Sequence, residues 1–211
     1  MAWRACRCAL AEPHSSTGLA RTWDVAIVGA GPAGTAAALA ALSARPGLDV
    51  LLLDRSEFPR DKACGDGIAP QVMDVLADVG VRGLLGDKVP IPRLRLQRGD
   101  ACVSRSMARP AWVVPRLDFD SRLLGAATAA GARVVKYRAR TLALEPDAVV
   151  INGDVRARVL VGADGAHSSV RNAIAVPAVR RRAFALRGYM ETPAQRHGRN
   201  AARLRARPAG R

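Results

Sequence analysis

Three closely spaced glycines form the first candidate site in this chain. The segment Gly29-Ala-Gly31-Pro32-Ala33-Gly34 has glycine at its first, third and sixth positions. In a strand–turn–helix unit the first glycine permits a tight turn, the second lets a pyrophosphate approach the backbone, and the third allows close helix packing. The helix N-terminus adds N–H groups without intrahelical partners and the positive end of the helix dipole. The spacing therefore indicates a site for the phosphates of a dinucleotide.

The residues around this turn supply the elements that such a site needs. The apolar run Asp24–Val28 is typical of a buried parallel strand. Pro32–Arg45 is rich in Ala and Leu, begins with Pro and is followed by Pro46-Gly47, which predicts a helix and its end. Asp49–Asp54 predicts a second buried strand, so the three elements form a βαβ unit with a right-handed crossover. An ordinary glycine-rich turn is the alternative, and this context argues against it.

An acidic residue, Asp54, ends the second strand twenty residues after Gly34. A carboxylate at this place accepts hydrogen bonds from the ribose of an adenine dinucleotide. We therefore assign Asp54, with the adjacent Arg55, to the cofactor site. The glycine turn and the acid together fit either NAD or FAD.

A second glycine-containing element follows a strand predicted at Val155–Val161. It is Gly162-Ala-Asp164-Gly165, ahead of a helix that begins near His167. Asp is a good N-terminal cap, so a turn that only caps this helix is the alternative to a cofactor contact. No nucleophile elbow precedes His167 and Ser168, and we therefore expect no hydrolase triad.

The loop between the second strand and the next helix, Pro70–Val79, is long. Residues 55–68 are fourteen residues with no predicted regular structure, and such loops are uncommon unless functional. The loop contains Phe58-Pro-Arg-Asp-Lys-Ala-Cys64-Gly65-Asp66-Gly67, in which the two glycines would let the backbone lie against a flat group. For Cys64, the role of a small buried hydrophobic residue is an equally good interpretation.

The remaining elements are predicted by shorter patterns. Arg93–Gln97 and Cys102–Ser106 alternate as strands of a second, antiparallel sheet, and Leu117–Ala130 is a helix. After these we expect a strand at Arg133–Tyr137, a small meander at Thr141–Leu144 and Ala148–Ile151, a type I′ turn at Asn152-Gly153, and a strand over Ala183–Tyr189.

Four of these motifs, in this order, resemble those of the flavin-dependent monooxygenase-like superfamily over roughly residues 23–190. They are the glycine turn, the Cys64 loop, the pattern Arg116-x-x-Phe-Asp-x-x-Leu and the Asp164-Gly165 element. The loop, Pro-Arg-x-Lys-x-Cys-Gly-Asp-Gly, is similar to the signature of the geranylgeranyl reductase family, flavoenzymes that saturate prenyl double bonds.

The resemblance implies an FAD site. In it the glycine turn and Asp54 hold the ADP half, Cys64–Gly67 borders the isoalloxazine ring, and Arg116, Asp164 and Gly165 make further contacts. It implies NAD(P)H as electron donor and a small isoprenoid substrate, reached through peripheral contact with a membrane. Aromatic hydroxylases and halogenases on the same scaffold are the alternative enzymes, and an inactive flavin-binding fragment is a third possibility. No catalytic residue is identified.

These observations predict a Rossmann-like α/β fold with part of an antiparallel substrate-domain sheet. We expect a flexible leader at 1–21, an FAD-binding domain at 22–175 with 90–110 inserted as substrate-domain strands, the start of the substrate domain at 176–191, and a disordered Arg-rich tail at 192–211. The family's second Gly-Asp box is missing, so we expect a truncated or frame-shifted product.

The net charge of +15 is concentrated near the C-terminus. Residues 176–211 contain ten Arg and one acid, so the excess on the rest of the chain is modest, and we expect no specific nucleic-acid partner. The four cysteines do not have the spacing of a zinc site, and we expect no metal. The N-terminal apolar patch is too short for a secretory signal, which favours a cytoplasmic location.

Overall fold

The computed structural model describes residues 19, 21–174, 186–189 and 201–205. The chain divides into two compact units: residues 1–60 and 119–182 belong to the first, and residues 61–118 and 183–211 belong to the second. The second unit is wider than the expected insertion of residues 90–110, since it begins at Asp61 and therefore includes Cys64. The leader, apart from Leu19 and Arg21, lies outside the described residues.

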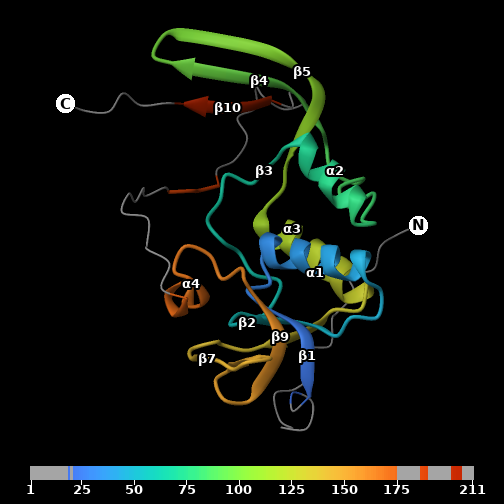
Figure 1. Ribbon diagram of the computed structural model, residues 1–211. Helices are drawn as coiled ribbons and strands as arrows, with labels where there is room; N and C mark the ends of the chain where they lie inside the picture. Colours follow the sequence, from blue (N-terminus) through green and yellow to red (C-terminus); the bar gives the residue numbers. More distant parts are fainter. Residues whose placement is uncertain (1–18, 20, 175–185, 190–200, 206–211) are drawn as a thin grey trace, which may run out of the picture. The chain divides into compact units, whose positions relative to one another are not determined.

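The first unit is built on a six-stranded sheet, in the order β6-β2-β1-β9-β8-β7 (Figure 1). Neighbours among β6, β2, β1 and β9 are parallel, and β7 and β8 add an antiparallel edge. This arrangement confirms the predicted Rossmann-like βαβ unit. The strands are β1 (Thr22–Val28), β2 (Val50–Asp54), β6 (Arg133–Lys136), β7 (Leu142–Leu144), β8 (Val149–Ile151) and β9 (Val155–Gly162).

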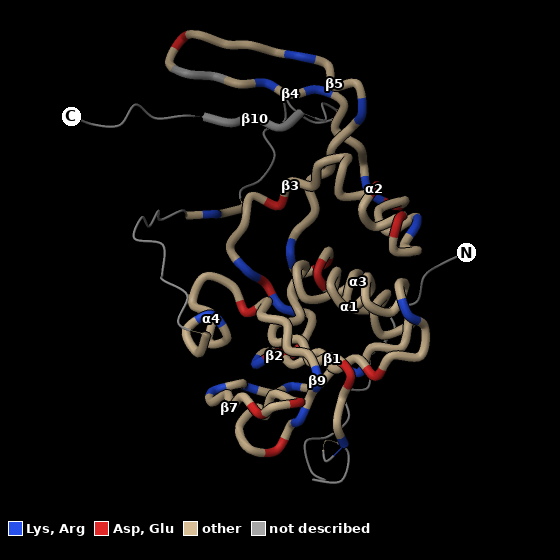
Figure 2. The backbone as a smooth tube through the Cα atoms, in the orientation of Figure 1, with Lys and Arg blue, Asp and Glu red and all other residues tan. Residues whose placement is uncertain are grey.

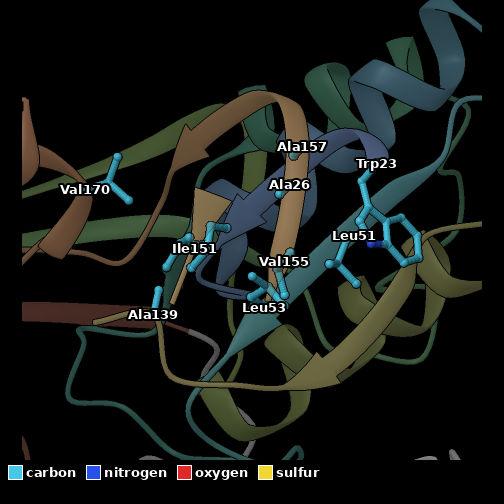
Figure 3. Close-up of a cluster of buried hydrophobic side chains, with 10 residues drawn as sticks. Trp23, Ala26, Leu51, Leu53, Ala139, Ile151, Val155, Ala157 and Val170 are labelled. Carbon is cyan, nitrogen blue, oxygen red and sulfur yellow. The ribbon is translucent and has the colours of Figure 1, made fainter. Parts of the chain in front are cut away.

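Strand β2, which lies between β6 and β1, is the most deeply buried strand of this sheet. All five residues of β2 are buried, which explains why that strand is continuously apolar until Asp54. Helix α1 (Pro32–Ala44) packs against β1, β2 and β9. Figure 3 shows a cluster of buried side chains in this unit, which includes Trp23, Leu51 and Leu53. The unit also contains α4 (Ser169–Ala173) and most of α3 (Arg116–Ala129).

The turn between β8 and β9 has the predicted type I′ conformation at its two central residues. Asn152 and Gly153 have φ angles of +52° and +86°, and the Asp154 N–H donates to the Ile151 carbonyl at 3.2 Å. Both positive angles are required by this turn, which explains the Asn-Gly pair. The meander of β7, β8 and β9 is therefore also confirmed.

The second unit contains a four-stranded sheet, in the order β10-β4-β5-β3. Strands β4 and β5 form an antiparallel hairpin longer than the sequence predicts, and basic residues recur along it (Figure 2). The elements are β3 (Gly67–Ile68), α2 (Pro70–Asp78), β4 (Ile91–Arg98), β5 (Ala101–Val113) and β10 (Ala201–Arg205). In the part of the chain that the structure describes, no helix is long and apolar enough to cross a bilayer.

Three expectations differ from this structure. Gly67–Ile68, the end of the expected loop, pairs with β5, and Asp66 just before it has a φ of +55°. Ala201–Arg205, inside the expected disordered tail, pairs with β4, since the backbone of an edge strand needs no apolar side-chain period. Residues 186–189 are not a strand but contact the Cys64 loop through side chains. The rest of 175–200 and residues 206–211 lie outside the described residues.

Candidate dinucleotide site

The glycine turn between β1 and α1 is held by backbone contacts that leave no room for a side chain. Gly29 has a φ of +105°, and its N–H donates to the Leu53 carbonyl at 2.7 Å. A Cβ at Gly29 would lie 2.3 Å from the Ala163 oxygen, and a Cβ at Gly34 would lie 1.8 Å from the Gly29 oxygen. Both glycines are therefore required by the packing of α1 against the ends of β1 and β9.

The same packing presents the N-terminus of α1. Gly31 is the N-cap and carries no side chain, and Pro32 at the first helical position has no N–H. The next amides, of Ala33 and Gly34, have no carbonyl one turn earlier within the helix. Thr35 fixes the turn, because its hydroxyl lies 3.0 Å from the Ala30 oxygen and 2.9 Å from the Gly31 oxygen. The arrangement suits an anion at the helix N-terminus.

Asp54 lies against this turn and is only 8% exposed. Its Oδ2 accepts a hydrogen bond from the Ala30 N–H at 2.8 Å, and its Oδ1 accepts one from the Ser56 N–H at 2.9 Å. Each carboxylate oxygen has a second lone pair, so both can also accept from a ribose hydroxyl. The backbone donors fix the carboxylate in place beside the turn.

Arg60 is a residue of this site that the sequence reasoning missed. Its Nη2 lies 3.6 Å from Asp54 Oδ2, and its Nη1 lies 3.9 Å from Asp120 Oδ2. The guanidinium also lies 4.7 Å from the ring centroid of Phe58. In the sequence, Arg60 was marked only by its place in the Pro-Arg motif of the Cys64 loop. Its approach to Asp120, sixty residues later, depends on the fold and could not be predicted.

Asp164 caps α4 with one carboxylate oxygen, and its second oxygen takes no part in the cap. Its Oδ2 accepts from the Ser169 N–H at 2.5 Å, so the interpretation as a cap of α4 is correct as far as it goes. Its Oδ1 is buried and has no hydrogen-bond partner among the residues that the structure describes. Because a buried polar oxygen is costly without a donor, a ligand hydroxyl would complete this residue. The side chain of Ser168 also caps α4, by accepting from the Arg171 N–H at 3.0 Å.

These groups converge because β2, β1 and β9 are parallel neighbours. Gly29 follows β1, Asp54 ends β2, and Asp164 follows β9, so all three lie at the carboxyl edge of the sheet. This edge is where open α/β sheets bind dinucleotides. Arg55 and Gly165 are exposed beside them. The first unit thus brings the glycine turn and Asp54, which were assigned to the ADP half of the cofactor, together with Asp164, which was assigned a further contact. Their contact with the cofactor stays a prediction.

The other assigned residues belong to the second unit. Cys64 is a free, half-buried thiol, and Arg116 is half-buried at the start of α3. Cβ atoms at Gly65 and Gly67 would meet no described atom within 4 Å, which leaves this backbone open. Asp66 is 3% exposed, and within the described part of the chain its buried Oδ1 has no hydrogen-bond partner.

The donor and acceptor groups fit FAD. The N-terminus of α1 suits a pyrophosphate, the Asp54 carboxylate suits a ribose diol, and the unpartnered Asp164 Oδ1 suits a further hydroxyl. The fold and these residues together define a dinucleotide-binding α/β domain.

Comparison with known proteins identifies the family. Residues 22–192 match the FAD binding domain family, and the chain belongs to it. The chain is 35% identical over 184 residues to menaquinone reductase of Mycolicibacterium smegmatis, which covers 81% of this chain and 44% of the relative. It is 36% identical over 169 residues to digeranylgeranylglycerophospholipid reductase 1 of Methanopyrus kandleri, which covers 74% of this chain and 43% of the relative. The resemblance to geranylgeranyl reductases is therefore confirmed.

A solved structure gives the same fold. The flavin-dependent halogenase CmlS is 28% identical, with a TM-score of 0.62 over 74% of this chain and 32% of that chain. The chain spans less than half the length of these curated relatives and a third of the halogenase.

Proposed function

We propose that this chain binds FAD for the reduction of isoprenoid carbon–carbon double bonds, with NAD(P)H as the electron donor. The observation that carries the proposal is the convergence of the glycine turn, Asp54 and the unpartnered Asp164 oxygen at one edge of the sheet. FAD would supply the hydride transfer, and the protein would bind and orient it.

Each residue of this edge has a distinct part in binding. The turn that begins at Gly29 gives the pyrophosphate the N-terminus of α1, and Asp54 accepts from the adenosine ribose. The Arg60 guanidinium lies between the carboxylates of Asp54 and Asp120, so its positive charge offsets their negative charges beside the cofactor site. Asp164 accepts from a hydroxyl through Oδ1 while Oδ2 stays bound to α4.

The isoprenoid substrate is supported by the Cys64 loop and by the relatives. The loop resembles the geranylgeranyl reductase signature, and one relative is named for a digeranylgeranyl lipid. Such substrates reside in membranes, and we propose that the enzyme meets them by peripheral contact.

A second candidate function is halogenation or hydroxylation of an aromatic compound. It is favoured by the likeness to the flavin-dependent halogenase CmlS, which is 28% identical with a TM-score of 0.62. Both activities would use the glycine turn and Asp164 in the same way, so the ADP half does not separate them. The Cys64 loop favours the reductase.

The proposal is tested in two stages. First, the purified chain is titrated with FAD, and the flavin fluorescence and visible absorbance are followed; Asp164→Ala should weaken FAD binding, whereas Asp147→Ala, at an exposed position, should not. Failure of the unsubstituted chain to bind FAD would end the proposal. Second, the FAD-loaded chain is incubated with NADH or NADPH and a geranylgeranyl lipid. A product heavier by two hydrogen atoms per double bond supports the reductase, while a halide- or oxygen-dependent product from a phenol supports the alternative.

A further inference from the structure

Within the second unit, Arg187 contacts the loop just before Cys64. Its Nη2 donates to Asp61 Oδ1 at 2.8 Å and to Asp61 Oδ2 at 2.7 Å, and it also reaches the Lys62 carbonyl at 3.3 Å. The Arg187 side chain is only 15% exposed, in contrast to most arginines on a surface. A single guanidinium nitrogen of Arg187 thus hydrogen-bonds to both the Asp61 side chain and the Lys62 carbonyl, on the N-terminal side of Cys64.

Tyr189 contacts the loop on the other side of Cys64. Its hydroxyl donates to Asp66 Oδ2 at 2.8 Å, and the Arg187 guanidinium lies 4.4 Å from the centroid of its ring. Asp66 is buried, and its carbonyl accepts from the Val114 N–H at 2.8 Å, which connects this flank to the end of β5. Arg187 and Tyr189 therefore contact one another, and together they hydrogen-bond to the loop on both sides of Cys64.

The charges of this cluster keep the contacts intact at neutral pH. The hydrogen bond from Arg187 lowers the pKa of Asp61 and raises the pKa of Arg187 itself. The hydrogen bond to Asp66 raises the pKa of Tyr189, so the phenol keeps the proton that it donates. Between these two contacts, a Cβ at Gly65 would meet no described atom within 4 Å, so the backbone next to Cys64 has open space beside it.

We propose that Arg187 and Tyr189 are positioning residues that hold the Cys64 loop in the shape in which it meets the flavin. The inference rests on the proposed function, in which this loop borders the isoalloxazine ring. Neither residue need touch the cofactor: they act by fixing the backbone on both sides of Cys64. A segment far along the chain would thereby set the accessibility of the thiol and the surface offered to the ring.

The reaction rate of the Cys64 thiol tests this directly and without a cofactor. In a background of Cys6→Ser, Cys8→Ser and Cys102→Ser, Cys64 is the single thiol, and Ellman's reagent reports its accessibility. Arg187→Gln and Tyr189→Phe should each raise the rate about threefold or more, because a partly exposed ion pair or hydrogen bond contributes at about that level. The matched control is Arg109→Gln, which breaks an Arg–Asp pair of 2.6 and 2.8 Å with Asp74 in the same unit, away from the loop. Equal rates in all three variants and the parent would overturn the proposal.

A second arm separates this inference from the proposed function. Saturating FAD should slow the labelling of Cys64 in the parent. In Arg187→Gln the FAD dissociation constant should stay within about twofold, since the ADP half is held in the first unit, while the protection of Cys64 declines. A melting curve checks that each variant is folded. If Arg187→Gln is labelled faster but FAD does not protect Cys64 in the parent, Arg187 holds the loop as proposed. The same result would count against the proposal that this loop faces the flavin. Protection that survives unchanged in Arg187→Gln would refute the positioning role.

Discussion

Gly34→Ala is the substitution for which the structure makes the sharpest prediction. The new Cβ would lie 1.8 Å from the Gly29 oxygen, about 1.6 Å closer than an ordinary contact, and 3.2 Å from the Ala163 Cβ. The nearest atom is backbone, so no side chain can rotate away and the β1–α1 turn itself must move. Overpacking costs about 1–3 kcal/mol and sometimes more. We expect the upper end of that range, because the backbone itself must move, and subtract the gain of at most about 1 kcal/mol from replacing a helical glycine by alanine.

The assay follows the first unit alone. In a Trp3→Phe, Trp112→Phe background, fully buried Trp23 is the single tryptophan, and its fluorescence in urea reports the unfolding of this unit. A net loss of about 2 kcal/mol should lower the urea midpoint by about 1 M. The control is Gly125→Ala in α3, where a Cβ would meet nothing within 4 Å, and which should leave the midpoint unchanged or raise it. If Gly34→Ala unfolds at the same midpoint as Gly125→Ala, the account of the turn is wrong.

Two further predictions concern a carboxylate and a phenol. Asp54→Asn leaves one side-chain oxygen for two backbone donors and the ribose, so the FAD dissociation constant, measured by fluorescence titration, should rise about tenfold. The magnitude follows because a hydrogen bond to a charged group contributes about 1.5 kcal/mol. An unchanged dissociation constant would show that Asp54 does not bind the cofactor. The pKa of Tyr137 is raised above its ordinary value of 10.0, first by burial and then by its hydrogen bond to Asp154. The unfolded chain therefore loses this proton first, so the stabilisation is complete below pH 10 and is lost as the pH rises above it. Tyr137→Phe should flatten the decline of the urea midpoint between pH 9 and 11, and a decline of the same steepness would contradict this account.

The glycine turn and the carboxylate beside it were largely predictable because their signals are local. The apolar run to Val28, the glycine spacing and the acid at Asp54 lie within one βαβ unit, and each pattern follows from the backbone it must adopt. The parallel pairing of β1 with β2 was also implied, since consecutive parallel strands joined by a helix lie side by side. The double role of Asp164, which caps α4 through one oxygen and keeps the other unpartnered, was not predictable, because the burial of that oxygen depends on packing.

By itself, then, the sequence determined the fold class, the glycine turn and the identity of the acid beside it. Only the tertiary structure decided that Arg60 lies between Asp54 and Asp120, that the chain divides at Asp61 rather than at residue 90, and that Arg187 grips the Cys64 loop. The physical reason is distance along the chain. Periodicity and glycine spacing reflect the conformation of a few neighbouring residues. An ion pair such as Arg187–Asp61 joins residues 126 positions apart, and the sequence around either residue gives no sign of it.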